Sequence, residues 1–94
     1  MLTVNISRHA HKFLLKLPTK HARQIKSKIE ALIAFPVPAD SKQLVNYFPY
    51  RRADQGEYRI IYKVENDILY IVLVGKRNDD EVYKNMKNLL KSKR

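Results

Sequence analysis

The 94-residue sequence contains no cysteine. A chain without thiols can build neither a disulfide framework nor a thiolate metal site, so a reducing compartment imposes no chemical constraint on it. It also lacks an apolar run long enough to span a bilayer, and residues 1–15 do not show the succession of a secretion signal. We therefore expect a cytoplasmic protein without a membrane partner.

Several catalytic signatures are absent as well. The chain has two glycines and no glycine-rich phosphate loop, no HExxH motif and no Ser-His-Asp constellation. His9, His11 and His21 are spaced by two and ten residues, which does not align them on one helix face, so we expect them to be solvated. The sequence predicts no metal and no cofactor.

Acidic residues are scarce. Nineteen Lys and Arg stand against nine Asp and Glu, a formal net charge of +10. So strong a field on a small body attracts polyanions, and the expected partners are nucleic acid, an acidic protein, or both. A basic domain that is merely soluble remains the alternative.

The length and the apolar content indicate one domain over residues 1–94. A chain of this size buries enough surface for a single core, and 45% of its residues are apolar or aromatic. Residues 2–6 alternate like a strand, and Ser7 follows as a helix N-cap. Apolar residues then recur with helical spacing on both sides of Pro18, up to the FPVP segment: Ala10, Phe13, Leu14, Leu17, Ala22, Ile25, Ile29, Leu32 and Ile33.

The outer faces of these two predicted helices are basic, and only Glu30 opposes them. Such a face is either solvated or tracks phosphates, and both interpretations stay open. The basic residues are Arg8, Lys12, Lys16, Lys20, Arg23, Lys26 and Lys28.

Residues 36–46 read as a loop, and three strands separated by turns follow over residues 47–77. The third of these, residues 68–74, is apolar on both faces, as in a covered central strand. Asn78 and Glu81 have capping-box spacing before a third helix whose inner face would carry Val82, Met86, Leu89 and Leu90. The predicted fold is α+β, in the order β-α-α-β-β-β-α: an antiparallel meander with an N-terminal helical hairpin and a C-terminal helix.

Cations gather at one end of this predicted sheet. With one turn near Gln55 and the next between Asn66 and Asp67, Arg59 lies across from Arg51 and near Val74, and Gly56 lies opposite Arg77. The cluster then contains Arg51 or Arg52, Arg59, Lys76 and Arg77. Like charges opposed across strands are unfavourable, so an anion is expected to offset them.

Arg59 alternates to the face opposite Tyr58, Ile60 and Tyr62, and Tyr83 is placed to reach back over the cationic end. Arginine forks suit phosphate oxygens and aromatic rings suit unpaired bases, a pairing that favours single-stranded RNA over duplex DNA. The competing interpretation pairs Arg59 with Glu57 or Asp54 at a solvated edge and gives Tyr83 a packing role.

Two segments, RRADQGEYRIIYKV and IVLVGKRNDDEVYKN, resemble the RelE/ParE superfamily of bacterial toxins from type II toxin-antitoxin systems. The resemblance extends over the order of elements and implies a RelE/ParE-like, microbial RNase-like fold. It favours the RelE-like branch, whose members are mRNA interferases: metal-independent endoribonucleases that cut mRNA in the ribosomal A site in the bacterial cytoplasm.

Carried over by position, the resemblance implies that Arg59 and Arg77 contact the scissile phosphate and that Tyr83 stacks on or helps activate the reacting nucleotide. Arg52 matches the arginine before the turn, and Arg51 or Lys76 would assist in RNA binding. The family often has further cations where this sequence has Phe48, Tyr50 and Val45. None of these replacements supplies a cation, which leaves the proton-transfer role unassigned.

The resemblance also implies a cognate acidic antitoxin encoded by an adjacent gene, with the free toxin monomeric and the complex heteromeric. The antitoxin would cover the cationic end or displace the third helix together with Tyr83. Two other functions stay open: a ParE-like DNA gyrase poison, and a catalytically inactive basic module that binds an antitoxin.

Overall fold

The computed structural model describes residues 2–44, 47–77 and 81–92 and, within the last segment, the side chains of residues 83–88. Five strands and three helices lie in this part of the chain. Their bounds are β1 Thr3–Ile6, α1 Arg8–Leu15, α2 Thr19–Ala34, β2 Ser41–Gln43, β3 Arg51–Gln55, β4 Tyr58–Glu65, β5 Ile68–Lys76 and α3 Glu81–Ser92. The predicted α+β fold is confirmed, and β2 is an additional strand within the segment expected to be a loop.

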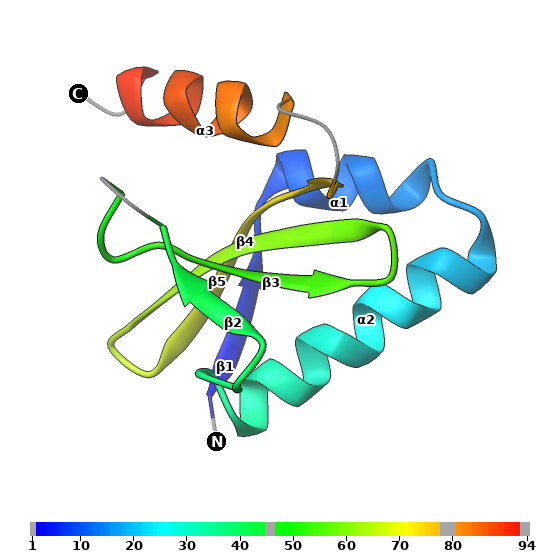
Figure 1. Cartoon of the computed structure of the whole chain (residues 1–94), viewed down its shortest axis with the longest axis horizontal. Helices are drawn as coiled ribbons and strands as arrows, with labels where there is room; N and C mark the ends of the chain where they lie inside the picture. The colour runs from blue at the N-terminus through cyan, green and yellow to red at the C-terminus, as the bar shows by residue number, and fades with distance from the viewer. Residues whose placement is uncertain (1, 45–46, 78–80, 93–94) are drawn as a thin grey trace.

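The strands form one sheet in the order β1-β5-β4-β3-β2 (Figure 1). Strands β3, β4 and β5 are the predicted antiparallel meander. Strand β2 extends it antiparallel to β3, and β1 lies parallel to β5 at the opposite edge. The two helices between β1 and β2 carry the chain from one edge of the sheet to the other.

The two turns of the meander differ in how well the sequence predicted them. Asn66 and Asp67 have φ angles of 52° and 63°, a left-handed pair typical of a two-residue hairpin, as predicted. The β3–β4 turn instead lies at Gly56 and Glu57, between the paired residues Gln55 and Tyr58. Gly56 has φ of 59°, a conformation that glycine adopts at little cost. The turn predicted near Gln55 was therefore too early, which displaces the register along β3.

Helix α1 begins at the predicted cap. The Ser7 hydroxyl accepts a hydrogen bond from the Ala10 backbone N–H at 3.1 Å and donates one to the Val72 carbonyl at 2.6 Å. The cap therefore ties α1 to β5. Beyond Pro18, α2 runs back along the sheet, and the two helices diverge in an open V (Figure 1).

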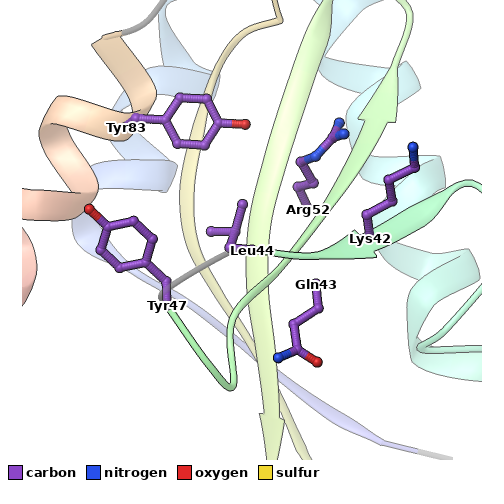
Figure 2. A pocket seen from close by; sticks show the side chains of 6 residues that line it. All are labelled: Lys42, Gln43, Leu44, Tyr47, Arg52 and Tyr83. Atoms are coloured by element: carbon purple, nitrogen blue, oxygen red, sulfur yellow. The ribbon is translucent and has the colours of Figure 1, made fainter.

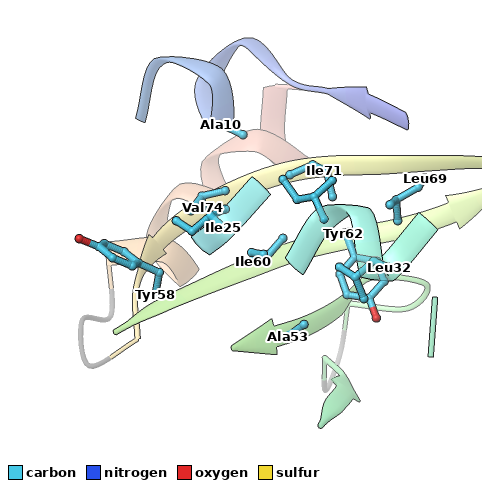
Figure 3. Packing of buried hydrophobic residues seen from close by; sticks show 11 residues of the cluster. Ala10, Ile25, Leu32, Ala53, Tyr58, Ile60, Tyr62, Leu69, Ile71 and Val74 are labelled. Carbon is cyan, nitrogen blue, oxygen red and sulfur yellow. The ribbon is translucent and has the colours of Figure 1, made fainter. Parts of the chain in front are cut away.

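Both helices pack on one face of the sheet, where the larger core lies (Figure 3). This helix-face core contains Ala10, Ile25, Ile29, Leu32, Ala53, Tyr58, Ile60, Tyr62, Leu69, Ile71 and Val74. Its tyrosine hydroxyls are hydrogen-bonded: Tyr62 donates to the Pro36 carbonyl at 2.6 Å, and Tyr58 lies 2.8 Å from His21 Nδ1. His21 is thus partly buried against Tyr58, contrary to the expectation that it is solvated.

The opposite face carries a smaller core under α3. This α3-face core contains Leu44, Tyr50, Ile61, Val72, Leu73 and Met86. Met86 is fully buried, as predicted for the inner face of the third helix. The cap predicted at Asn78 and the side chains of Val82, Leu89 and Leu90 lie outside the described residues. None of the helices in the described ranges is long and apolar enough to cross a membrane.

Candidate active site

Strand alternation places Arg59 on the α3 side of the sheet. Its neighbours Tyr58 and Ile60 are buried in the helix-face core, so the side chain between them must point the other way. Arg59 pairs with Asp54 on β3 and with Gly75 on β5. Because Gly75 has no side chain, Asp54 is the cross-strand neighbour that meets the guanidinium.

The guanidinium of Arg59 is held at two edges. Nε lies 2.8 Å from Asp54 Oδ1 and Nη2 lies 3.3 Å from Asp54 Oδ2, a two-pronged ion pair. On the other side, Nη1 donates to the Tyr83 hydroxyl at 2.6 Å. The hydrogen bond with Asp54, opposed by desolvation and aided by the charge of Asp54 and by Tyr83, raises the pKa of Arg59. Arg59 is therefore a permanently charged, fixed fork that touches Tyr83.

Asp54 is a carboxylate among arginines. Its Oδ2 lies 3.7 Å from Arg52 Nη1, in addition to the two contacts with Arg59. Burial by itself would raise the pKa of Asp54, but the hydrogen bond from Arg59 and the charges of Arg59, Arg52 and Arg77 outweigh burial and lower it. The anion that was expected to offset the cationic cluster is thus a carboxylate of the chain itself. Of the two residues considered as ion-pair partners of Arg59, Glu57 and Asp54, the structure shows Asp54.

Arg77 lies directly after β5, and its side chain is exposed. Its backbone N–H donates to the Glu57 carbonyl at 2.8 Å, which fixes this point of the chain against the β3–β4 turn. Gly56 had been predicted to face Arg77, one residue away from the observed partner. The charge of Arg77 is the smallest of the contributions that lower the pKa of Asp54.

A pocket of about 340 Å³ adjoins the cluster, between α3 and the β2–β3 edge (Figure 2). It is lined by Lys42, Gln43, Leu44, Tyr47, Arg52 and Tyr83. Figure 2 shows the two tyrosine rings on one side and the cationic side chains on the other, with Leu44 between them. The volume falls in the usual range of small-ligand sites. This lining offers tyrosine rings on which a planar ligand can stack and two cations that can bind an anion.

Lys42 is a site residue that the sequence reasoning missed. It lies on β2 directly opposite Arg52 and brings a cation to the pocket from a segment that was expected to be a loop. Phe48 is exposed and Tyr50 belongs to the α3-face core, while Val45 lies outside the described residues. Lys42 shares a face with Arg52 because the two residues are direct partners in the β2–β3 pairing, which a strand of three residues is too short to indicate in the sequence.

Two predicted members do not join the cluster. Arg51 pairs with Tyr62, not with Arg59, and its Nη2 donates to Ser41 Oγ at 3.0 Å on the helix side of the sheet. Lys76 pairs with Tyr58 and is exposed. Because the β3–β4 turn lies later than predicted, Arg51 pairs with Tyr62 and lies on the helix side of the sheet. A bulge between Ile61 and Tyr62 moves Arg59 from Val74 to Gly75 and leaves Lys76 on the same side as Tyr58.

Solved toxins share this fold. An archaeal RelE from the RelE–RelB complex of Pyrococcus horikoshii OT3 is 28% identical, with a TM-score of 0.73, covering 82% of this chain and 96% of that one. The isolated Escherichia coli RelE toxin is 20% identical, with a TM-score of 0.73 and coverages of 96% and 99%. RelE from the Methanococcus jannaschii RelB–RelE complex is 24% identical, with a TM-score of 0.67 and coverages of 90% and 98%. The chain thus has the fold of RelE toxins.

Residues 4–81 match the family model described as the ParE toxin of the type II toxin-antitoxin system parDE. No curated protein sequence matches the chain significantly. The chain belongs to this family, within the RelE/ParE superfamily, and is a toxin of a type II toxin-antitoxin system.

Proposed function

We propose that this toxin is a ribosome-dependent mRNA endoribonuclease of the bacterial cytoplasm that stops translation by cutting mRNA in the A site. The observation that carries the proposal is the fixed Arg59 fork, which touches the Tyr83 hydroxyl beside a pocket lined by Tyr47, Arg52 and Lys42. Phosphate-binding cations and stacking rings are the two elements with which proteins hold single-stranded RNA.

The chemistry needs no nucleophile from the protein. The 2′-oxygen of one nucleotide forms a bond to phosphorus while the bond from phosphorus to the next 5′-oxygen breaks, which leaves a cyclic phosphate and a free 5′-hydroxyl. The proton leaves the 2′-hydroxyl, and one is taken up by the departing oxygen. Arg59 and Arg77 stabilise the extra negative charge on the phosphate oxygens as it develops. Tyr83 holds the base of the reacting nucleotide by stacking.

The remaining cations are assigned to binding. Arg52 and Lys42 face the pocket and contact phosphates on either side of the cleaved one. Arg51 and Lys76, on the other side of the sheet, contribute to RNA binding only through their charge, which adds to the field of a chain with net charge +10.

The test is cleavage by wild type, Arg59→Ala and Arg77→Ala on ribosomes programmed with a defined mRNA, with new 5′ ends mapped by primer extension. We expect codon-positioned cuts by wild type and a loss of roughly 10²–10³-fold in rate for each variant. Arg23→Ala is the matched control, because it removes an exposed arginine from α2, which covers the other face of the sheet. Equal activity of all four proteins, or no cuts by wild type, would reject the nuclease.

A second function, poisoning of DNA gyrase, is favoured by the description of the matched family as the parDE toxin. Supercoiling and cleavage-complex assays with purified gyrase separate the two. Inhibition by wild type without mRNA cleavage would support this second function, whereas unimpaired gyrase removes it.

The proposed partner is an acidic antitoxin encoded by an adjacent gene, which keeps a monomeric toxin in a heteromeric complex. RelE toxins of the same fold were crystallised with RelB, and this chain's charge of +10 favours an acidic partner. Co-expression with the neighbouring reading frame should yield a complex of the two proteins that co-purifies. In this complex, we expect the antitoxin to cover the site or to displace α3. Failure of the two products to associate would contradict the pairing.

A further inference from the structure

Asp54 places a negative charge inside a site that the proposed function assigns to a phosphate. The carboxylate contacts both Nε and Nη2 of Arg59 and approaches Arg52, and 28% of its side chain is exposed. A carboxylate at that place weakens phosphate binding through space, so its presence calls for a compensating role.

The geometry of the pair indicates what that role is. Asp54 and Arg59 are direct partners on β3 and β4, so both side chains start from paired backbone that cannot slide. Two contacts to one planar fork fix its rotation as well as its position. The carboxylate occupies the side edge of the guanidinium and leaves Nη1 on the edge that meets the Tyr83 hydroxyl.

Arg59 keeps donors for a ligand in this arrangement. Of its five N–H groups, one each on Nε, Nη1 and Nη2 is used in the contacts with Asp54 and Tyr83. The two others, one on each terminal nitrogen, have no partner among the described residues, and the one on Nη2 belongs to the end edge of the fork. An oxyanion approaching beside Tyr83 meets that end edge, so Asp54 and a phosphate can bind Arg59 together.

We propose that Asp54 is a positioning residue: it grips the side edge of Arg59 so that the end edge of the fork, next to the Tyr83 hydroxyl, is presented to the scissile phosphate. This inference rests on the proposed nuclease function. Asp54 touches neither RNA nor the reacting atoms, and its effect passes through Arg59.

The first experiment compares wild type, Asp54→Asn and Glu57→Gln. Glu57 is an exposed carboxylate three residues along the same hairpin, so both variants change the net charge equally. The readouts are single-turnover cleavage of ribosome-bound mRNA and binding of a short 2′-deoxy oligonucleotide, which cannot be cleaved. For Asp54→Asn we expect cleavage to fall by about tenfold to a hundredfold while the Kd of the oligonucleotide is unchanged or lower. Glu57→Gln should match wild type in cleavage.

The two possible roles of Asp54 predict opposite changes in the cleavage rate of Asp54→Asn. If Asp54 instead competed with the phosphate for Arg59, its removal would tighten oligonucleotide binding and speed cleavage together. Faster cleavage by Asp54→Asn would therefore overturn the inference.

A double-mutant cycle tests whether Asp54 acts through Arg59. Arg59→Lys removes the planar fork and keeps the charge. Asp54→Asn should then cost no further cleavage activity in the Arg59→Lys background, because no fork remains to be oriented. Equal losses from Asp54→Asn in both backgrounds would show that Asp54 acts independently and would overturn the inference.

A readout without RNA separates this inference from the nuclease proposal. The readout is the NMR resonance of the Arg59 Nε–H in the purified toxin. In wild type and Glu57→Gln this resonance should be resolved from those of the other arginines, and its proton should exchange slowly with water. In Asp54→Asn it should lose both properties. If wild type cuts no mRNA but the resonance behaves as expected, the proposed function fails while the grip on Arg59 stands. An Arg59 resonance that Asp54→Asn leaves unchanged overturns the inference, whatever the cleavage result. Asp54→Ser replaces Asp54→Asn if the latter does not give a folded spectrum.

Discussion

The two faces of the sheet differ in what they bury. The helix-face core is apolar apart from hydroxyl groups whose bonds are satisfied, such as Tyr62 on the Pro36 carbonyl. The α3-face core is smaller and borders the charged group of Arg52, Asp54 and Arg59. Adjacent residues of β4 thus serve different purposes, because alternate side chains of a strand point to opposite faces. The sheet thus lies between the larger core, which contributes most to stability, and the candidate site. We therefore expect substitutions on the two faces to differ in their effects on stability and on RNA binding.

The largest effect is expected from Ile60→Ala on the helix side. Ile60 is fully buried in the larger core, and the truncation should lower the free energy of unfolding by about 2–5 kcal/mol. Urea denaturation measures this, together with oligonucleotide affinity under conditions where the variant is folded. Affinity should be unchanged, and a weakened Kd in the folded variant would contradict the separation of the two faces.

Met86→Ala is the counterpart on the α3 side. Met86 is fully buried, but it belongs to the smaller core, so we expect a loss at the low end of the range, about 2 kcal/mol. Tyr83 lies on the same helix, so loosening α3 should also weaken the Arg59–Tyr83 contact and raise the Kd of the oligonucleotide. A stability loss with unaltered affinity would show that α3 packing and the site are independent.

The smallest effect concerns pH and comes from the charged side of the sheet. The pKa of Asp54 is lowered in the folded chain, so its contribution to stability is complete above its ordinary value of 3.8 and is lost as the pH falls through the folded value. Wild type should lose about 1 kcal/mol of this contribution on acidification, a figure reduced for solvent screening of the partly exposed pair.

Asp54→Asn has no carboxyl group at this place, so its unfolding free energy should depend less on pH below about 4. Urea midpoints of wild type and variant at about pH 7 and about pH 3 measure the difference. Parallel curves for the two proteins would show that Asp54 does not contribute to stability through ionisation.

Local patterns were sufficient for the helices, for the three strands of the meander and for the face of Arg59. Apolar spacing of 3.6 residues predicted α1 and α2, and Ser7 marked the start of α1, because a cap depends on residues only three apart. Alternation placed Arg59 opposite Ile60, and the motif around Arg59, Arg77 and Tyr83 indicated the toxin superfamily before the family model confirmed it.

The composition and the short-range order of the sequence by themselves determined a basic α+β chain with Arg59 and Tyr83 on one side of a sheet. Only the tertiary structure decided which charges meet there: Asp54 against Arg59, Lys42 beside Arg52, and Arg51 on the other face. The physical reason is that register depends on a turn at Gly56 and Glu57, on a bulge after Ile61, and on pairing of β2, a strand too short to show a period. A shift of one residue moves a side chain to the other face, so small uncertainties in turns become large ones in a site.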